Sequence, residues 1–208
     1  MLSEIQRDVL SEILNTNIGM AASVLSEMVN QKIILSVPKV DLQKGHEIDL
    51  SVFEKDMADF RTSVLSTIRF GQGFSGNAYI VFPADKAKDL VNACVGDLEY
   101  VHDEYSKLDA EDFDVIKEIS NVILNSLIGE FGNLLNVKLE FSFPDVELTM
   151  IDTVENSVLP EDLNFLSMHT SFLLSKSQVR GMIFIALSVS SVNMLLDKIN
   201  DMLGEIDG

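Results

Sequence analysis

An acid, a second acid four residues later and an asparagine three residues after that form a row of polar side chains that occurs twice. The two copies are Asp8, Glu12 and Asn15, and Asp114, Glu118 and Asn121. At roughly 100° per residue, the members of one copy fall within about 60° of one another on an α-helix. A carboxamide can hold a water molecule by donating and accepting hydrogen bonds, and a nearby carboxylate can pair with a cation. Such a row can position a water without a nucleophile from the protein.

A polar row on a single helix is usually no more than a solvated face. Two observations favour a function here. Asparagine is a poor residue for the middle of a helix, yet it occupies the same slot in both copies. A proline also stands 23 residues after each asparagine, at Pro38 and Pro144, whereas other outward positions differ, as Ser11 does from Lys117.

The sequence contains an internal repeat. Residues 8–40 align without gaps to residues 114–146, an offset of 106. We therefore predict two similar units, residues 1–104 and residues 105–208. The junction between them is short, which favours one compact body.

Each unit is expected to contain a long helix, a strand that ends near the proline, two strands joined by a turn, and a closing helix. The predicted helices are residues 4–29, 84–95, 111–135 and 188–203. The predicted strands are residues 32–37, 65–70, 76–82, 137–143, 165–174 and 179–187. Residues 70–74 and 175–178 are expected to form hairpin turns, and Asp109 or Asp112 to cap the second long helix.

These elements predict an α/β (α+β) fold with a pseudo-twofold tandem repeat, in which a mixed or antiparallel sheet packs with the two long helices. Apolar residues cover the side of each long helix away from the polar row, so the rows should face outward. These residues are Val9, Leu10, Ile13, Leu14 and Ile18 on the first helix, and Val115, Ile116, Ile119, Val122, Ile123 and Leu124 on the second.

Composition limits the classes of partner and site. The net charge of −18 repels phosphate backbones and anionic lipids, so we expect no nucleic acid and no membrane partner. The lone Cys94 offers no disulfide framework, favours a cytoplasmic location and is interpreted as a buried structural thiol. His46, His102 and His169 lack the spacing of metal ligands, so no metal site is predicted.

The spacing Asp-x3-Glu-x2-Asn-x22-Pro resembles the signature of the CheC/CheX/FliY family, chemotaxis phosphatases that act on the phosphorylated response regulator CheY. Two copies in one chain resemble CheC more than CheX, which has one copy, or FliY, which carries a further C-terminal domain. The resemblance implies a cytoplasmic hydrolase of two-component signalling that dephosphorylates the phospho-aspartate of a CheY-like regulator. It implies no cofactor of the protein's own, because the regulator supplies the metal, Mg²⁺.

The resemblance also implies roles for the residues of the motif. Asn15 and Asn121 would orient the hydrolytic water, and Glu12 and Glu118 would hold the partner. The remaining members are expected to support the motif, the acids at the helix start or partner edge and the prolines at the strand end. These supporting residues are Asp8, Pro38, Asp114 and Pro144.

The chain departs from the family pattern beside the asparagine, where Leu14 and Ser120 replace the usual glycine. We expect Leu14 to crowd a docked partner at the first row and Ser120 to leave more room at the second. The departure keeps a rival interpretation open, a non-catalytic module of the same fold that binds a response regulator or CheD. A third interpretation is a structural duplication without phospho-chemistry.

Overall fold

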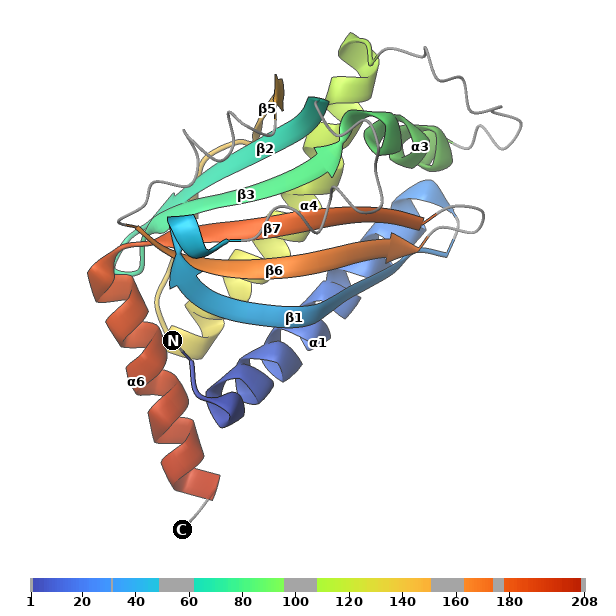
Figure 1. Cartoon of the computed structure of the whole chain (residues 1–208). Helices are drawn as coiled ribbons and strands as arrows, with labels where there is room; N and C mark the ends of the chain where they lie inside the picture. The colour runs from blue at the N-terminus through green and yellow to red at the C-terminus, as the bar shows by residue number, and fades with distance from the viewer. Residues whose placement is uncertain are drawn as a thin grey trace.

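The computed structural model describes residues 2–30, 32–48, 62–95, 108–150, 163–173 and 178–206. Its elements, in chain order, are α1 (Glu4–Val29), β1 (Ile34–Lys44), the 3₁₀ helix η1 (Gly45–Glu47), β2 (Thr62–Gly71), β3 (Gly76–Pro83), α3 (Ala84–Val95), α4 (Ala110–Leu135), β4 (Glu140–Phe141), β5 (Asp145–Met150), β6 (Asn164–Leu173), β7 (Gln178–Leu187) and α6 (Val189–Ile206). Figure 1 shows α1 and α4 packed beside each other on one face of the sheet, running in opposite directions.

Within the described residues, the strands form one seven-stranded sheet in the order β1-β6-β7-β3-β2-β4, with β5 also pairing with β2. Every pairing among the described strands is antiparallel, which confirms the predicted α/β class with a mixed or antiparallel sheet. The first strand of each half of the sequence joins strands of the other half, since β1 pairs with β6, and β4 and β5 pair with β2. The two halves therefore share one sheet. The boundary predicted at residues 104 and 105 lies outside the described residues.

The two long helices begin with the same arrangement. Ser3 and Asp109 are the N-caps, and in each case the side chain of the residue three positions later accepts a hydrogen bond from the backbone N–H of the cap. These partners, Gln6 and Asp112, are again 106 residues apart. Asp109 thus caps the second long helix, which confirms the first of the two predicted caps, Asp109 and Asp112. Both helices end at an asparagine in the left-handed conformation, Asn30 (φ 50°) and Asn136 (φ 52°).

The helices bury their apolar sides against one face of the sheet. Fully or nearly fully buried side chains of this layer include Leu10, Leu14 and Ile18 of α1, Ile116, Ile123 and Leu127 of α4, and Ile68, Ile80 and Ile183 of the strands. Burial of each such side chain contributes roughly 1.5–3 kcal/mol. Successive residues of the central strand β7 alternate between this cluster and a second one on the other face, so β7 is buried on both sides.

Two glycines that align in the two halves lie where the central strands β3 and β7 meet. A Cβ atom at Gly76 would clash with the carbonyl oxygen of Ala186, and one at Gly181 would lie 2.8 Å from the carbonyl oxygen of Val81. The close approach of these backbones therefore requires glycine at both positions.

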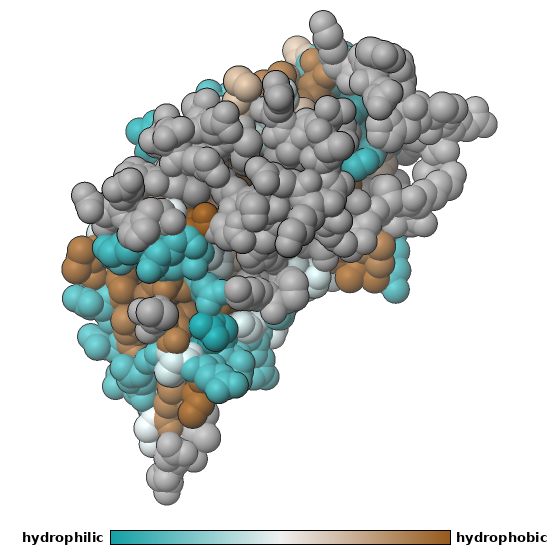
Figure 2. All heavy atoms as spheres, viewed as in Figure 1, coloured by the Kyte–Doolittle hydropathy of each residue, from teal (hydrophilic) through white to brown (hydrophobic). Residues whose placement is uncertain are grey.

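The closing helices α3 and α6 complete the fold. Figure 2 shows hydrophobic and hydrophilic residues side by side over α6, the surface of an amphipathic helix. The buried side of α6 carries Val192, Leu195 and Ile199, which join the main core. On α3, burial raises the pKa of the Cys94 thiol to about 11, so the thiol is protonated at neutral pH. This state fits the structural role expected of Cys94.

The helix predictions agree closely with the structure. The bounds of α1 and α3 were predicted to the residue, and those of α4 and α6 to within three residues. The predicted turn at residues 70–74 joins β2 to β3, with Gln72 and Gly73 both at φ 85°. The second predicted turn lies almost wholly outside the described residues.

The strand predictions near the two prolines were wrong. β1 does not end near Pro38 but continues to Lys44, with a register irregularity between Ser36 and Lys39. The proline is tolerated because β1 lies at an end of the strand order and the ladder is interrupted there. The strand predicted at residues 137–143 is reduced to the two-residue β4, and β5 was not predicted at all.

Candidate functional site

The two polar rows lie on α1 and α4, within the first half of each helix, and face away from the core as predicted. The side chains of Asp8, Glu12 and Asn15 on α1 are exposed, as are those of Asp114 and Glu118 on α4, whereas Asn121 is half-buried. Each helix therefore presents a carboxylate and a carboxamide one turn apart on a rigid scaffold. The structure supplies positioned hydrogen-bonding groups at both rows, but no nucleophile within either row.

The residues beside the asparagines do not lie on the exposed rows. The side chains of Leu14 and Ser120 are both fully buried, with 0% relative exposure. Each immediately precedes its asparagine, so it points roughly 100° around the helix from the row, toward the sheet. The expectation that Leu14 crowds a docked partner is therefore wrong. Leu14 is a core residue, and the hydroxyl of Ser120 is buried without a hydrogen-bond partner among the described residues.

The second row contains a contact that the sequence prediction missed. The side-chain Nδ2 of Asn125 donates a hydrogen bond of 2.8 Å to Oδ1 of Asn121. Asn125 lies one helical turn after Asn121, and this i, i+4 spacing of two amides was the available signal. At the aligned position of α1 the chain has Gly19, which carries no side chain to make the same bond.

Backbone-directed hydrogen bonds accompany the first row. The hydroxyl of Thr16 donates to the carbonyl oxygen of Glu12 at 3.0 Å, and Nδ2 of Asn17 donates to that of Ile13 at 2.8 Å. A salt bridge of 2.9 Å between Arg7 and Asp41 joins the start of α1 to β1. The first row is thus tied to the sheet through its helix.

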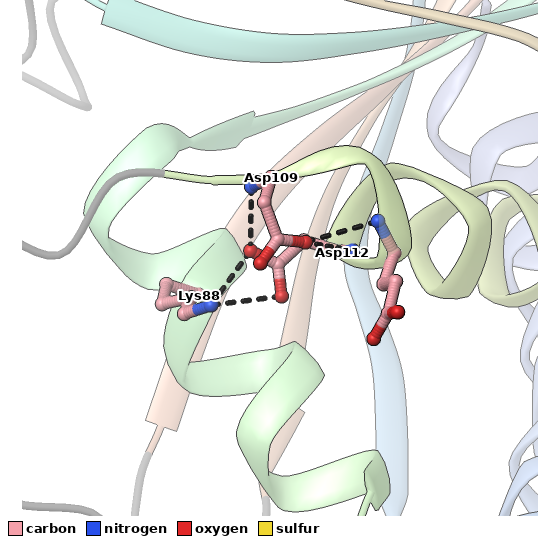
Figure 3. A network of polar contacts seen from close by, with 4 residues as sticks. Lys88, Asp109 and Asp112 are labelled. Atoms are coloured by element: carbon pink, nitrogen blue, oxygen red, sulfur yellow. Dashed lines mark hydrogen bonds and ion pairs between the residues drawn. The ribbon is translucent and has the colours of Figure 1, made fainter.

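A largely buried ion pair holds the start of α4, close to the second row. Figure 3 shows Lys88 of α3 pointing to Asp112, whose carboxylate oxygens lie 2.8 and 2.6 Å from Nζ. Asp112 also accepts a hydrogen bond of 2.8 Å from the backbone N–H of Asp109. At the aligned position of α1, Gln6 donates instead to Asn200 of α6 at 2.7 Å. Each long helix is therefore tied to a closing helix, by charges in α4 and by neutral amides in α1.

The two prolines of the motif do not occupy equivalent places in the strand pattern. Pro144 is buried in the link between β4 and β5. Pro38 lies within β1, in the segment where the register is irregular. Both therefore interrupt regular pairing, but neither ends a long strand as predicted.

No group of three or more His, Cys, Asp or Glu side chains within the described ranges is arranged to hold a metal ion. None of the helices in the described part of the chain is both long and apolar enough to cross a membrane.

The fold is one antiparallel sheet covered on one face by two long helices, each with an outward Asp/Glu/Asn row. No model of a known protein family matches the chain. In sequence it is 24% identical over 160 residues to the CheY-P phosphatase CheC of Bacillus subtilis, covering 77% of this chain and 74% of CheC. It is 26% identical over 147 residues to the flagellar motor switch phosphatase FliY of Bacillus subtilis, covering 71% of this chain and 36% of FliY.

Solved structures share the fold over nearly the whole chain. Thermotoga maritima FliY aligns with a TM-score of 0.74 at 18% identity, covering 97% of this chain and 98% of that one. FliM from H. pylori, solved in complex with SpeE, aligns with a TM-score of 0.69 at 13% identity, covering 97% of each chain. The resemblance indicated by the doubled row is thereby confirmed, because the chain is similar in sequence to proteins named as CheC and FliY phosphatases and shares the fold of FliY.

Proposed function

We propose that the chain hydrolyses the phospho-aspartate of a CheY-like response regulator, and that each row positions the attacking water. The observation that carries this proposal is the presentation of a glutamate and an asparagine, one turn apart and facing outward, at matching positions of two capped helices. The similarity to proteins named as chemotaxis phosphatases supports it.

The chemistry requires little covalent participation from the protein. The regulator would supply the phospho-aspartate, a lysine and Mg²⁺, and its cations would neutralise phosphate charge. The carboxamide of Asn15 or Asn121 holds a water in line with phosphorus, by accepting one hydrogen bond and donating another. The water attacks phosphorus as the aspartyl oxygen leaves, which regenerates the aspartate carboxylate of the regulator and releases inorganic phosphate. Confining the water in line converts a diffusive encounter into an oriented one.

The glutamates have a different task in this proposal. Glu12 and Glu118 lie one turn before the asparagines and are exposed, so either can reach a partner that approaches the row. Pairing with the lysine of the regulator gives a charge-assisted contact that fixes the docking geometry. The supporting acids Asp8 and Asp114 are exposed a further turn back, at the edge of the same surface.

The test is the decay of CheY-like regulators from the same genome, phosphorylated with acetyl phosphate, in the presence of this chain. The intact chain should accelerate decay of its regulator, and the double variant Asn15→Ala/Asn121→Ala should lower that acceleration about 100-fold while retaining the fold. A double variant of Ser11→Ala/Lys117→Ala, which alters outward positions beside the rows, serves as the matched control. Full activity of the asparagine double variant would contradict the proposal.

A second candidate function is a non-catalytic module that binds the regulator or a partner such as CheD. The similarity to FliM structures, which include FliM in complex with SpeE and with FliG, favours it. This alternative predicts that a phosphorylated regulator binds to the chain without a change in its rate of decay. Binding measured by titration calorimetry alongside the decay assay separates the two functions.

A further inference from the structure

The half-buried carboxamide of Asn121 is held by a neighbour on its own helix. We propose that Asn125 is a positioning residue, which fixes the orientation of Asn121 and thereby prepares the second row for hydrolysis. The inference rests on the proposed function, because it assigns to Asn125 a role in placing the same water.

The direction of the hydrogen bond decides how Asn121 can be used. Nδ2 of Asn125 donates to Oδ1 of Asn121 at 2.8 Å. The terminal torsion of an asparagine is otherwise broad, so a free carboxamide samples many orientations. With Oδ1 engaged from one side, Asn121 retains its second lone pair and both N–H groups for a water and a partner.

Packing alone does not explain an asparagine at position 125. Asparagine is unfavourable in the middle of a helix compared with leucine or methionine. The Oδ1 atom of Asn125 is also buried without a hydrogen-bond partner among the described residues, which is a further cost. An apolar residue at this position would avoid both costs. Within the described residues, the one hydrogen bond from the side chain of Asn125 goes to Asn121. The benefit of this asparagine is therefore to the second row.

The first row offers a matched comparison at the aligned position, Gly19. No side chain at this position can contact Asn15, which lies one turn earlier on α1. A Cβ atom built at Gly19 meets no other atom within 4 Å, so the position has room for an asparagine. The contact found in the second row can therefore be removed there and installed in the first.

The kinetic test isolates one row at a time, using a phosphorylated CheY-like regulator. In the Asn15→Ala background, where the second row acts alone, Asn125→Ala should lower kcat about tenfold with little change in KM. In the Asn121→Ala background, Gly19→Asn should raise the kcat of the first row severalfold, whereas Gly19→Ala should not. Gly19→Ala controls for the gain in helix propensity. Unchanged kcat in Asn125→Ala would overturn the proposal, and so would an equal gain from both substitutions at Gly19.

Two further readouts separate this proposal from loss of fold and from failure of the proposed function. Asn125→Ala removes a buried oxygen without a partner, so its midpoint of thermal unfolding should not fall, and a large fall would mark a structural role. In the ¹⁵N-labelled chain, the side-chain N–H resonances of Asn125 should shift on Asn121→Ala. Absence of that shift overturns the proposal even if the chain has no phosphatase activity. A shift together with an inactive intact chain would instead contradict the proposed function.

Discussion

The helices α1 and α4 share a scaffold but differ in the side chains that support their rows. Both are 26 residues long, both start with a capping box and both end at a left-handed asparagine. The differences lie beside the rows, where α1 has Leu14 and Gly19 and α4 has Ser120 and Asn125. The backbone therefore presents the two rows alike, whereas the order of each carboxamide depends on its own neighbours.

The side-chain contacts that hold the starts of α1 and α4 also differ. Lys88 and Asp112 make a largely buried ion pair at α4, whereas α1 makes an exposed Gln6–Asn200 hydrogen bond to α6 and a more exposed Arg7–Asp41 salt bridge to β1. A charge-assisted contact with little exposure to solvent holds its geometry more firmly than a neutral, hydrated one. The ion pair holds the start of α4 close to the second row, which suits a group that must place a water.

The largest expected effect is on the two buried residues that precede the asparagines. Leu14→Ala removes a fully buried side chain and should cost about 3 kcal/mol of unfolding free energy. Ser120→Ala removes a buried hydroxyl without a partner and should be neutral or stabilising by up to about 1 kcal/mol. Urea denaturation of both variants provides the measurement. A neutral Leu14→Ala variant with faster turnover would restore the view that Leu14 obstructs the partner.

The next largest effect on the unfolding free energy concerns the side-chain contacts that join the long helices to the closing helices. Lys88→Ala leaves the buried Asp112 carboxylate without its cation and should lower the unfolding free energy by about 2–3 kcal/mol. Gln6→Ala should cost less than about 1 kcal/mol. Lys86→Ala is the matched control, because Lys86 belongs to a more exposed ion pair on the same helix and should cost under about 0.5 kcal/mol. Equal costs for all three variants would remove this difference between α1 and α4.

The exposed glutamates should affect binding more than turnover. Glu118→Gln removes the charge but keeps the shape, and we expect a roughly tenfold higher KM with a smaller change in kcat. Glu12→Gln should act in the same direction at the first row. Steady-state phosphate release in the single-row backgrounds measures both effects, and raised salt should reduce the difference between wild type and variant. A loss confined to kcat would assign the glutamates to the reaction itself.

The smallest effect should be equal in the two helices. Ser3→Ala and Asp109→Ala each remove an N-cap and should each cost about 1 kcal/mol of unfolding free energy. Thermal or urea unfolding of the pair checks this prediction. A cost at Asp109 several times that at Ser3 would show that the scaffold itself, and not only its side chains, differs between the halves.

The sequence predicted the elements that local interactions define. The bounds of α1 follow from its own residues, because Ser3 caps its start and Asn30 ends it in the left-handed conformation. The extent of β1 past Pro38 was not predictable in this way. A proline is tolerated there because of the position of β1 in the strand order, and that order depends on β6, which is remote in sequence.

The candidate site was predicted less evenly. The outward direction of both rows follows from helical periodicity, and the structure agrees. The same periodicity places Leu14 on the core side, but its adjacency to Asn15 in sequence led to the wrong expectation of crowding. Asn125 was missed because the spacing of two amides does not reveal whether they bond, which depends on side-chain rotamers and on the burial of Asn125.

The most direct test of the central claim compares the chain with only its second row, Asn15→Ala, to the chain with only its first row, Asn121→Ala. The measurement is the rate of phosphate release from a CheY-like regulator that the intact chain dephosphorylates. We expect the Asn15→Ala variant to keep most of the intact activity and the Asn121→Ala variant to keep a minor fraction. Equal rates, or a faster Asn121→Ala variant, would contradict the claim that the contact from Asn125 improves the row of α4.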